Sequence, residues 1–271
     1  MRSRVLQRAL LLSVVLVLAV AAAACGGSSN EAASGVITGS GVQKAKDYDF
    51  SGFTSVRVDK GVSATVRQGD VYAVSASTNE NAVQYLKVTV EGDTLVVGLD
   101  PSKQYDLVDA YAEIVMPDLA SLEVTAGGDA YAQRFAASGD VALTVSGAAQ
   151  LNVDGMHVGS ATVKALGGGK LGGGIIVDDT LTVASEGSQV TLLGRALTVG
   201  LTGTKGSIVS LKNVVARTVN VVLTDASKAS VRATKTVNVA MAGASGLDYY
   251  GPATLGKTDI TGASQLSHIE Q

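Results

Sequence analysis

The sequence predicts an all-β protein whose larger part is a parallel β-helix, a solenoid with coils of about 19 residues. Three observations support this. A small-residue pentapeptide recurs at nearly constant spacing, apolar and polar residues alternate around it, and the composition suits many tight corners. Gly is abundant (32 residues), Pro is rare (3), and aromatic residues make up only 4 % of a chain that is 46 % hydrophobic. The apolar content is therefore carried by small and branched side chains.

The pentapeptide appears as GAAQL (147–151), GASGL (243–247) and GASQL (262–266). Its last residue, the anchor, can be followed through the chain at intervals of 18 to 20 residues. The predicted anchors are Tyr131, Leu151, Leu171, Val190, Val209, Ala229, Leu247 and Leu266. Gly or Ala stands three places before every anchor, and such a regular internal repeat is typical of a solenoid.

Side chains around each anchor alternate between apolar and polar with a period of two, which indicates strands with one buried face. A unit of this length is too short for a pair of helices and fits one coil of strand, corner, strand and turn. Equivalent residues of successive coils would stack about 4.8 Å apart. We expect the Gly/Ala position to form a column at a sharp corner, where a larger side chain would crowd its neighbours.

Residues 48–120 also contain short alternating runs typical of strands, but they break the spacing of the repeat. We expect this segment to cover one end of the solenoid, because an open sheet edge promotes aggregation. The predicted organisation is a signal peptide (1–24), a Gly/Ser-rich tether (25–47), an N-terminal β segment (48–120) and β-helix repeats (121–271).

The first residues indicate export. Three arginines within the first eight residues precede the apolar run 9–24, which is short for a membrane-spanning helix and ends in Ala-Ala-Ala before Cys25, the only cysteine. Small residues followed by cysteine resemble a lipobox, so Cys25 is the predicted site of lipid attachment and membrane anchoring. The alternative is an ordinary A-x-A cleavage site with a coincidental cysteine. Whether the host has one or two membranes stays open.

The charge argues against nucleic acid as a partner. The formal net charge is −3, and the remainder of the chain stands at −6 once the three N-terminal arginines are set aside. We expect no basic patch that could neutralise phosphates.

Few residues suggest catalysis. The two histidines, His157 and His268, have no plausible nucleophile near them in sequence, no His/Cys cluster has zinc spacing, and no cofactor is expected. The run LGGGKLGGG (166–174) lacks the Ser or Thr of a phosphate loop. Asp178 and Asp179 form an adjacent acidic pair that a turn between strands explains.

The residue before each anchor is often polar and predicted to point outward. We expect a candidate binding face along this strip, made of Gln150, Lys170, Gln189, Lys228 and Gln265. The alternative is a solvated face on which stacked amides hydrogen-bond one another.

The order of several short motifs resembles a known family. FTSVRV (53–58), VSATVRQGD (62–70), LKVTVEGDTLVV (86–97) and MPDLASLEVTAGGD (116–129) are followed by the Gly-Ala-Ser units and by GASGLDYYGPAT (243–254). Together they resemble the putative auto-transporter adhesin, head GIN domain family of secreted proteins and lipoproteins. The resemblance implies a right-handed parallel β-helix and an adhesin-like role, with no catalytic residues to carry over.

The expected function is therefore that of an envelope-anchored, noncatalytic lipoprotein that binds an envelope glycan or protein. Two alternatives stay open: a polysaccharide-active β-helix enzyme, and a structural spacer without a ligand.

Overall fold

The computed structural model describes residues 35–136 and 139–270. Gly35–Gln271 forms one compact unit, and the buried core lies entirely within it. The predicted signal peptide and the predicted lipid attachment site at Cys25 lie outside the described residues. In the described part of the chain, no helix is both long enough and apolar enough to cross a membrane.

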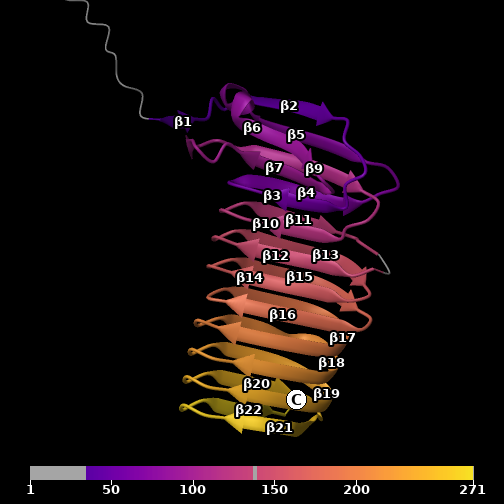
Figure 1. The fold of residues 1–271 in the computed structure, drawn as a ribbon, viewed down its shortest axis with the longest axis vertical. Helices are drawn as coiled ribbons and strands as arrows, with labels where there is room; N and C mark the ends of the chain where they lie inside the picture. Colours follow the sequence, from indigo (N-terminus) through magenta and orange to yellow (C-terminus); the bar gives the residue numbers. More distant parts are fainter. Residues whose placement is uncertain (1–34, 137–138, 271) are drawn as a thin grey trace, which may run out of the picture. The chain divides into compact units, whose positions relative to one another are not determined.

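The unit is a parallel β-helix, as predicted, in which two rows of strands face each other across the core (Figure 1). The first row contains, in spatial order, β7 (Thr94–Leu99), β3 (Ser55–Val58), β10 (Ser121–Val124), β12 (Val141–Ser146), β14 (Ala161–Leu166), β16 (Thr180–Glu186), the later parts of β17 (Gln189–Thr204), β18 (Ile208–Leu223) and β19 (Lys228–Met241), and β21 (Thr254–Ile260). The second row contains β9 (Ala110–Met116), β4 (Val62–Gln68), β11 (Asp129–Gln133), β13 (Gln150–Val158), β15 (Lys170–Val177), the first parts of β17, β18 and β19, β20 (Gly246–Tyr250) and β22 (Gln265–Ile269).

The apolar residues that alternate with polar ones in the sequence are the residues that the structure buries. In β12, for example, Val141, Leu143 and Val145 are buried whereas Ala142 is exposed. Leu143 pairs in register with Val163, and Val163 with Val183, so each inward residue packs on its equivalent in the next coil. Small and branched side chains fill this narrow interior, which is why so few aromatic residues are needed.

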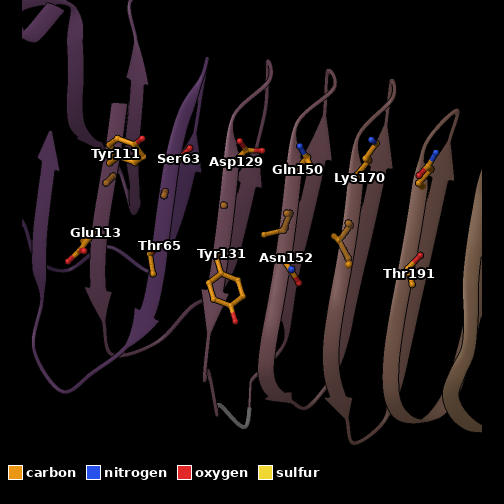
Figure 2. Close-up of a pocket in the computed structure, with 17 residues that line it drawn as sticks. Ser63, Thr65, Tyr111, Glu113, Asp129, Tyr131, Gln150, Asn152, Lys170 and Thr191 are labelled. Carbon is orange, nitrogen blue, oxygen red and sulfur yellow. The ribbon is translucent and has the colours of Figure 1, made fainter. Parts of the chain in front are cut away.

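Seven of the eight predicted anchors form one column. Leu151, Leu171, Val190, Val209, Ala229, Leu247 and Leu266 are Cα partners from coil to coil. The prediction for the first coil is wrong by one residue, because Ala130 and not Tyr131 pairs with Leu151. The coil between them is longer than the others, and Tyr131 points outward from the sheet (Figure 2).

The Gly/Ala column has a different cause from the expected crowding. Most corners are two-residue turns in which both central residues have positive φ, such as Gly147 (63°) with Ala148 (61°) and Gly243 (66°) with Ala244 (60°). In the first of these turns the Ala149 N–H donates to the Ser146 carbonyl at 3.3 Å, as in a type I′ turn. Ala244 is exposed, so the backbone conformation selects a small residue here and packing does not.

In several coils the residue that follows the two turn residues is a buried, hydrogen-bonded serine. Ser207, Ser227 and Ser245 are each at most 1 % exposed and stack at the same corner. The Ser207 hydroxyl donates to the Thr204 carbonyl at 2.6 Å, while the Ser207 N–H donates to Ser227 Oγ of the next coil at 3.2 Å. This three-residue unit therefore supplies two residues for the turn and one hydroxyl that joins neighbouring turns.

The N-terminal segment caps one end of the solenoid, as predicted, and also contributes coils to it. At that end the parallel rows give way to antiparallel strands: β5 (Ala73–Asn79) pairs with β9, and β6 (Leu86–Glu91) pairs with β7. The 3-10 helix η1 (Glu80–Tyr85) joins β5 to β6, and the short strands β1 (Val36–Thr38) and β8 (Gln104–Asp106) pair beside them. Figure 1 shows β2, β5, β6 and η1 together at this end.

The start of the solenoid and the end of the tether differ from the predicted positions. The pair β3 and β4 is already a full coil, inserted between β7/β9 and β10/β11, so the solenoid begins well before residue 121. The predicted tether, 25–47, is also too long, because β2 (Gln43–Tyr48) pairs antiparallel with β5. The exposed polar strand β2 has no buried face, and so its sequence lacks the alternation by which strands are predicted.

Candidate functional site

A groove of about 630 Å³ runs across the outer face of the second row of strands. Its side chains come from six adjacent strands, in the order β9, β4, β11, β13, β15 and β17 (Figure 2). Because a strand exposes every second residue, each strand offers two groups, and the register aligns these groups in two lines. The first line is Tyr111, Ser63, Asp129, Gln150, Lys170 and Gln189; the second is Glu113, Thr65, Tyr131, Asn152, Gly172 and Thr191.

The floor of the groove is made of small residues. Ser63 and Thr65 lie on β4, between Tyr111 on β9 and Tyr131 on β11. At the other end Gly172 presents no side chain beside Asn152. The groove is therefore hollow because short side chains lie between taller ones on a flat sheet.

Two tyrosines provide the aromatic surface of the groove. Tyr111 is 49 % exposed. The Tyr131 hydroxyl donates to Asp154 Oδ2 at 3.2 Å, which fixes the direction of the ring. Partial desolvation, followed by the neighbouring Asp154 carboxylate, raises the pKa of Tyr131 above its ordinary value. The ring therefore stays neutral and can offer a face and a polar tip to a ligand.

The other groups are mostly uncharged hydrogen-bonding side chains. Glu113, Asp129 and Lys170 are the charged lining residues, which gives the groove a formal charge of −1. Within residues 35–136 and 139–270, no group of three or more His, Cys, Asp or Glu side chains is placed to hold a metal ion. The site is equipped for hydrogen bonding and ring stacking.

The predicted binding face falls partly inside this groove. Gln150, Lys170 and Gln189 line it. Lys228 on β19 and Gln265 on β22 continue the same column outside it, where Ile208 and Gly246 interrupt the polar line. That these five residues bind a ligand stays a prediction.

The sequence did not point to Tyr111, Ser63, Thr65 or Glu113. All four lie on β9 and β4, in the segment whose spacing departs from the repeat. Alternation in VSATVRQ and AYAEIVM could have shown which residues face outward, but not that these strands extend the repeat face.

The remaining candidate residues have separate locations. His157 and Asp178, which are distant in sequence, come together with Nε2 2.9 Å from Oδ1, yet both side chains are about half exposed (47 % and 62 %). Asp179 lies in the turn before β16, as predicted, and its carbonyl accepts the Leu197 N–H. His268 stacks on Tyr249 with ring centroids 4.4 Å apart. Its Nε2 lies 2.9 Å from the Gly251 carbonyl oxygen, to which the ring donates in the tautomer that carries the proton on Nε2.

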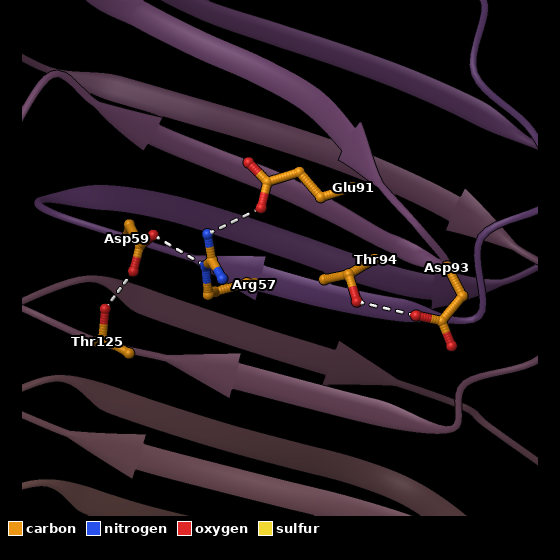
Figure 3. A network of polar contacts seen from close by, with 6 residues as sticks. All are labelled: Arg57, Asp59, Glu91, Asp93, Thr94 and Thr125. Atoms are coloured by element: carbon orange, nitrogen blue, oxygen red, sulfur yellow. Dashed lines mark hydrogen bonds and ion pairs between the residues drawn. The ribbon is translucent and has the colours of Figure 1, made fainter.

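A polar network on the first row joins the cap to the coils (Figure 3). Arg57 on β3 contacts Asp59 Oδ2 at 3.1 Å and Glu91 Oε2 of β6 at 3.5 Å. The Thr125 hydroxyl, from the next coil, donates to Asp59. These contacts connect β6, β3 and the turn after β10, across the intervening strand β7, and we assign them a structural role.

The comparisons with known proteins agree with this architecture. Solved structures with the same fold include one described as a putative lipid binding protein from Parabacteroides distasonis (18 % identity, 86 % of this chain and 99 % of that chain, TM-score 0.69). Two others are described as putative adhesins. The one from Parabacteroides merdae has 14 % identity and a TM-score of 0.71, over 86 % of this chain and 99 % of that chain. The one from Bacteroides fragilis has 17 % identity and a TM-score of 0.68, over 86 % of this chain and 100 % of that chain. At these identities the likeness shows the fold alone. No curated protein matches the sequence.

A family model covers residues 52–253, which is most of the solenoid together with its cap. Its description, an adhesin, is that of a surface or exported protein, and the resemblance drawn from the sequence motifs is confirmed. The chain belongs to the family described as putative auto-transporter adhesin, head GIN domain.

Proposed function

We propose that the protein is a noncatalytic adhesion module that binds an extended, uncharged or weakly charged glycan along the groove. The observation that supports this most strongly is the double line of side chains on six adjacent strands. At about 4.8 Å per strand, five steps span roughly 24 Å. A long ligand can therefore contact the same kinds of group repeatedly.

The groove lies on the face of a sheet and not at its edge. The backbone groups of β4, β11, β13 and β15 are already paired with strands on both sides. A peptide that binds by adding a strand needs an unpaired edge, so this mode is not available here. Contact must be made by side chains, and amides, hydroxyls and two tyrosines suit the hydroxyls and apolar ring faces of sugars.

Each contact in such an open groove is weak. Affinity then depends on several contacts made at once by one polymer, because each further contact forms at a high effective concentration. In this proposal the lipid on Cys25 holds the module at the cell envelope and the solenoid presents the groove to the glycan.

The unit 35–271 should be screened on an array of envelope and host glycans, alongside variants that are checked for folding by circular dichroism. The double variant Tyr111→Ala/Tyr131→Ala should weaken binding by about tenfold or more, since aromatic contacts dominate many binding sites. Tyr250→Ala is the matched control, because Tyr250 lies outside the groove and contacts Arg232.

Three results would reject the proposal. Undiminished binding by the folded double variant would exclude the groove. Release of shorter sugars from a bound glycan, abolished by Asp178→Asn, would favour the enzyme. Absence of binding to any glycan would leave the spacer as the better account.

A further inference from the structure

The later coils of the solenoid carry an excess of positive charge. Between residues 189 and 238 the chain has seven basic residues and one acidic residue, a local net charge of +6 in a chain whose total is −3. The basic residues are Arg195, Lys205, Lys212, Arg217, Lys228, Arg232 and Lys235. The overall acidic composition of the chain therefore hides a local excess of basic residues in these coils.

Three of these cations lie on successive coils where the chain bends from the second row into the first. Arg195 pairs with Val215 of the next coil. In the next pair of coils, Ala216 pairs with Ala233 and Thr218 pairs with Thr236. Arg217 therefore lies beside the segment of the following coil that contains Lys235. We call Arg195, Leu197, Val215, Arg217 and Lys235 the basic edge.

The three cations of the basic edge are exposed to solvent and can contact a partner. Within the described residues, Arg195, Arg217 and Lys235 form no ion pair. Lys205 is different, because it pairs with Glu186 at the corner turns. Asp178 borders the basic edge but already contacts His157 at 2.9 Å.

Exposed aliphatic side chains lie among these cations. Leu197 and Val215 are 47 % and 46 % exposed, and together with Arg195 and Arg217 they line a hollow of about 400 Å³. Leu197 and Val215 adjoin in one hollow, and contiguous exposed apolar side chains mark interaction surfaces. Basic residues interleaved with apolar ones are typical of surfaces that rest at a membrane interface.

We infer that the basic edge docks on the surface of an anionic lipid bilayer. The arginines and the lysine would lie among the phosphate groups, where each Lys or Arg near an anionic surface adds to the attraction. Leu197 and Val215 would enter the boundary between headgroups and acyl chains. The predicted anchor at Cys25 would keep the protein close enough to a membrane for this weak contact to form.

Vesicle co-sedimentation of the unit 35–271 tests this, with vesicles of phosphatidylcholine alone and of equal parts phosphatidylcholine and phosphatidylglycerol. The triple variant Arg195→Gln/Arg217→Gln/Lys235→Gln should bind the anionic vesicles about a hundredfold more weakly. The control Lys164→Gln/Lys205→Gln/Lys228→Gln removes the same net charge away from the edge and should bind nearly as well as the wild type. Leu197→Ser/Val215→Thr keeps every charge and should lose the part of the binding that survives high salt.

Several outcomes would overturn the inference. These are failure of the wild type to bind anionic vesicles, equal binding to neutral vesicles, and equal losses in the two triple variants, which would reflect net charge alone. A wild-type dimer by light scattering that the basic-edge variant converts to monomer would show that the edge holds a second copy instead. Tyr111→Ala/Tyr131→Ala should leave vesicle binding unchanged, so this test is independent of the groove.

Discussion

Glycine in place of Ala244 should stabilise the protein, whereas alanine in place of the preceding Gly243 should destabilise it. Both residues have positive φ (60° and 66°) in one turn. A left-handed conformation costs an L-residue about 1–2 kcal/mol, and Ala244→Gly removes that cost. The added freedom of glycine in the unfolded chain offsets about 0.4–1 kcal/mol. The net effect should be a stabilisation of about 0.5 kcal/mol.

The reverse exchange combines two penalties. Gly243→Ala introduces the left-handed cost, and its new Cβ would lie 2.9 Å from the Asp225 backbone nitrogen of the neighbouring coil. Real Cβ atoms do not approach backbone so closely, so the stacked turns must shift. After the gain of about 0.4–1 kcal/mol from a stiffer unfolded chain, we expect a destabilisation of about 1–3 kcal/mol.

Urea denaturation of the unit 35–271 measures both changes. Ala242→Gly is the control, because Ala242 does not have positive φ and should lose about 0.5–1 kcal/mol. The reasoning is refuted if Gly243→Ala is neutral, or if Ala244→Gly destabilises as much as the control does. Either result would mean that positive φ does not select the small residues at this corner.

Other predictions concern the corner, the charge ladder and the anchor. Ser227→Ala should destabilise by about 0.5–1.5 kcal/mol in the same assay, because the buried Ser207 N–H loses Ser227 Oγ and keeps only the Thr204 carbonyl as its acceptor, and an unchanged stability would contradict this. Glu186 raises the pKa of Lys205 above its ordinary value of 10.5, so the stability from this pair is fully present below pH 10.5 and disappears as the pH rises through the raised value. The difference in stability between wild type and Lys205→Gln should therefore be constant near neutral pH and vanish in strong alkali; a difference that persists there would argue against the pair. Metabolic labelling with a fatty acid should mark the wild type and not Cys25→Ala, and a label independent of Cys25 would exclude the anchor.

The solenoid could be predicted because its determinants repeat. A single coil shows only a weak alternation, but equivalent residues recur every 18 to 20 positions and reveal the coil length and the register. The register failed at Tyr131, where a longer coil shifts the phase by one residue. A shift of one residue exchanges the inner and outer faces, so Tyr131, a half-buried tyrosine that faces outward into the groove, was expected at an inward position.

The groove was less accessible to prediction because it depends on the order of the layers in space. The chain runs through β3 and β4, leaves to form the cap, and returns through β7 and β9 on the far side of that coil. Tyr111 therefore pairs with Ser63, although they are distant in sequence. The basic edge was missed for a related reason, since only the bends in β17, β18 and β19 bring its cations together.

The groove is the central claim, and the length dependence of glycan binding tests it most directly. Titration calorimetry should use oligosaccharides of increasing length, cut from whichever polymer binds best. Affinity should rise with each added sugar until the ligand spans about 24 Å, the distance from β9 to β17, and then level off. A monosaccharide that binds as tightly as the polymer would contradict the account, because it would place recognition in a single pocket and not along the strands.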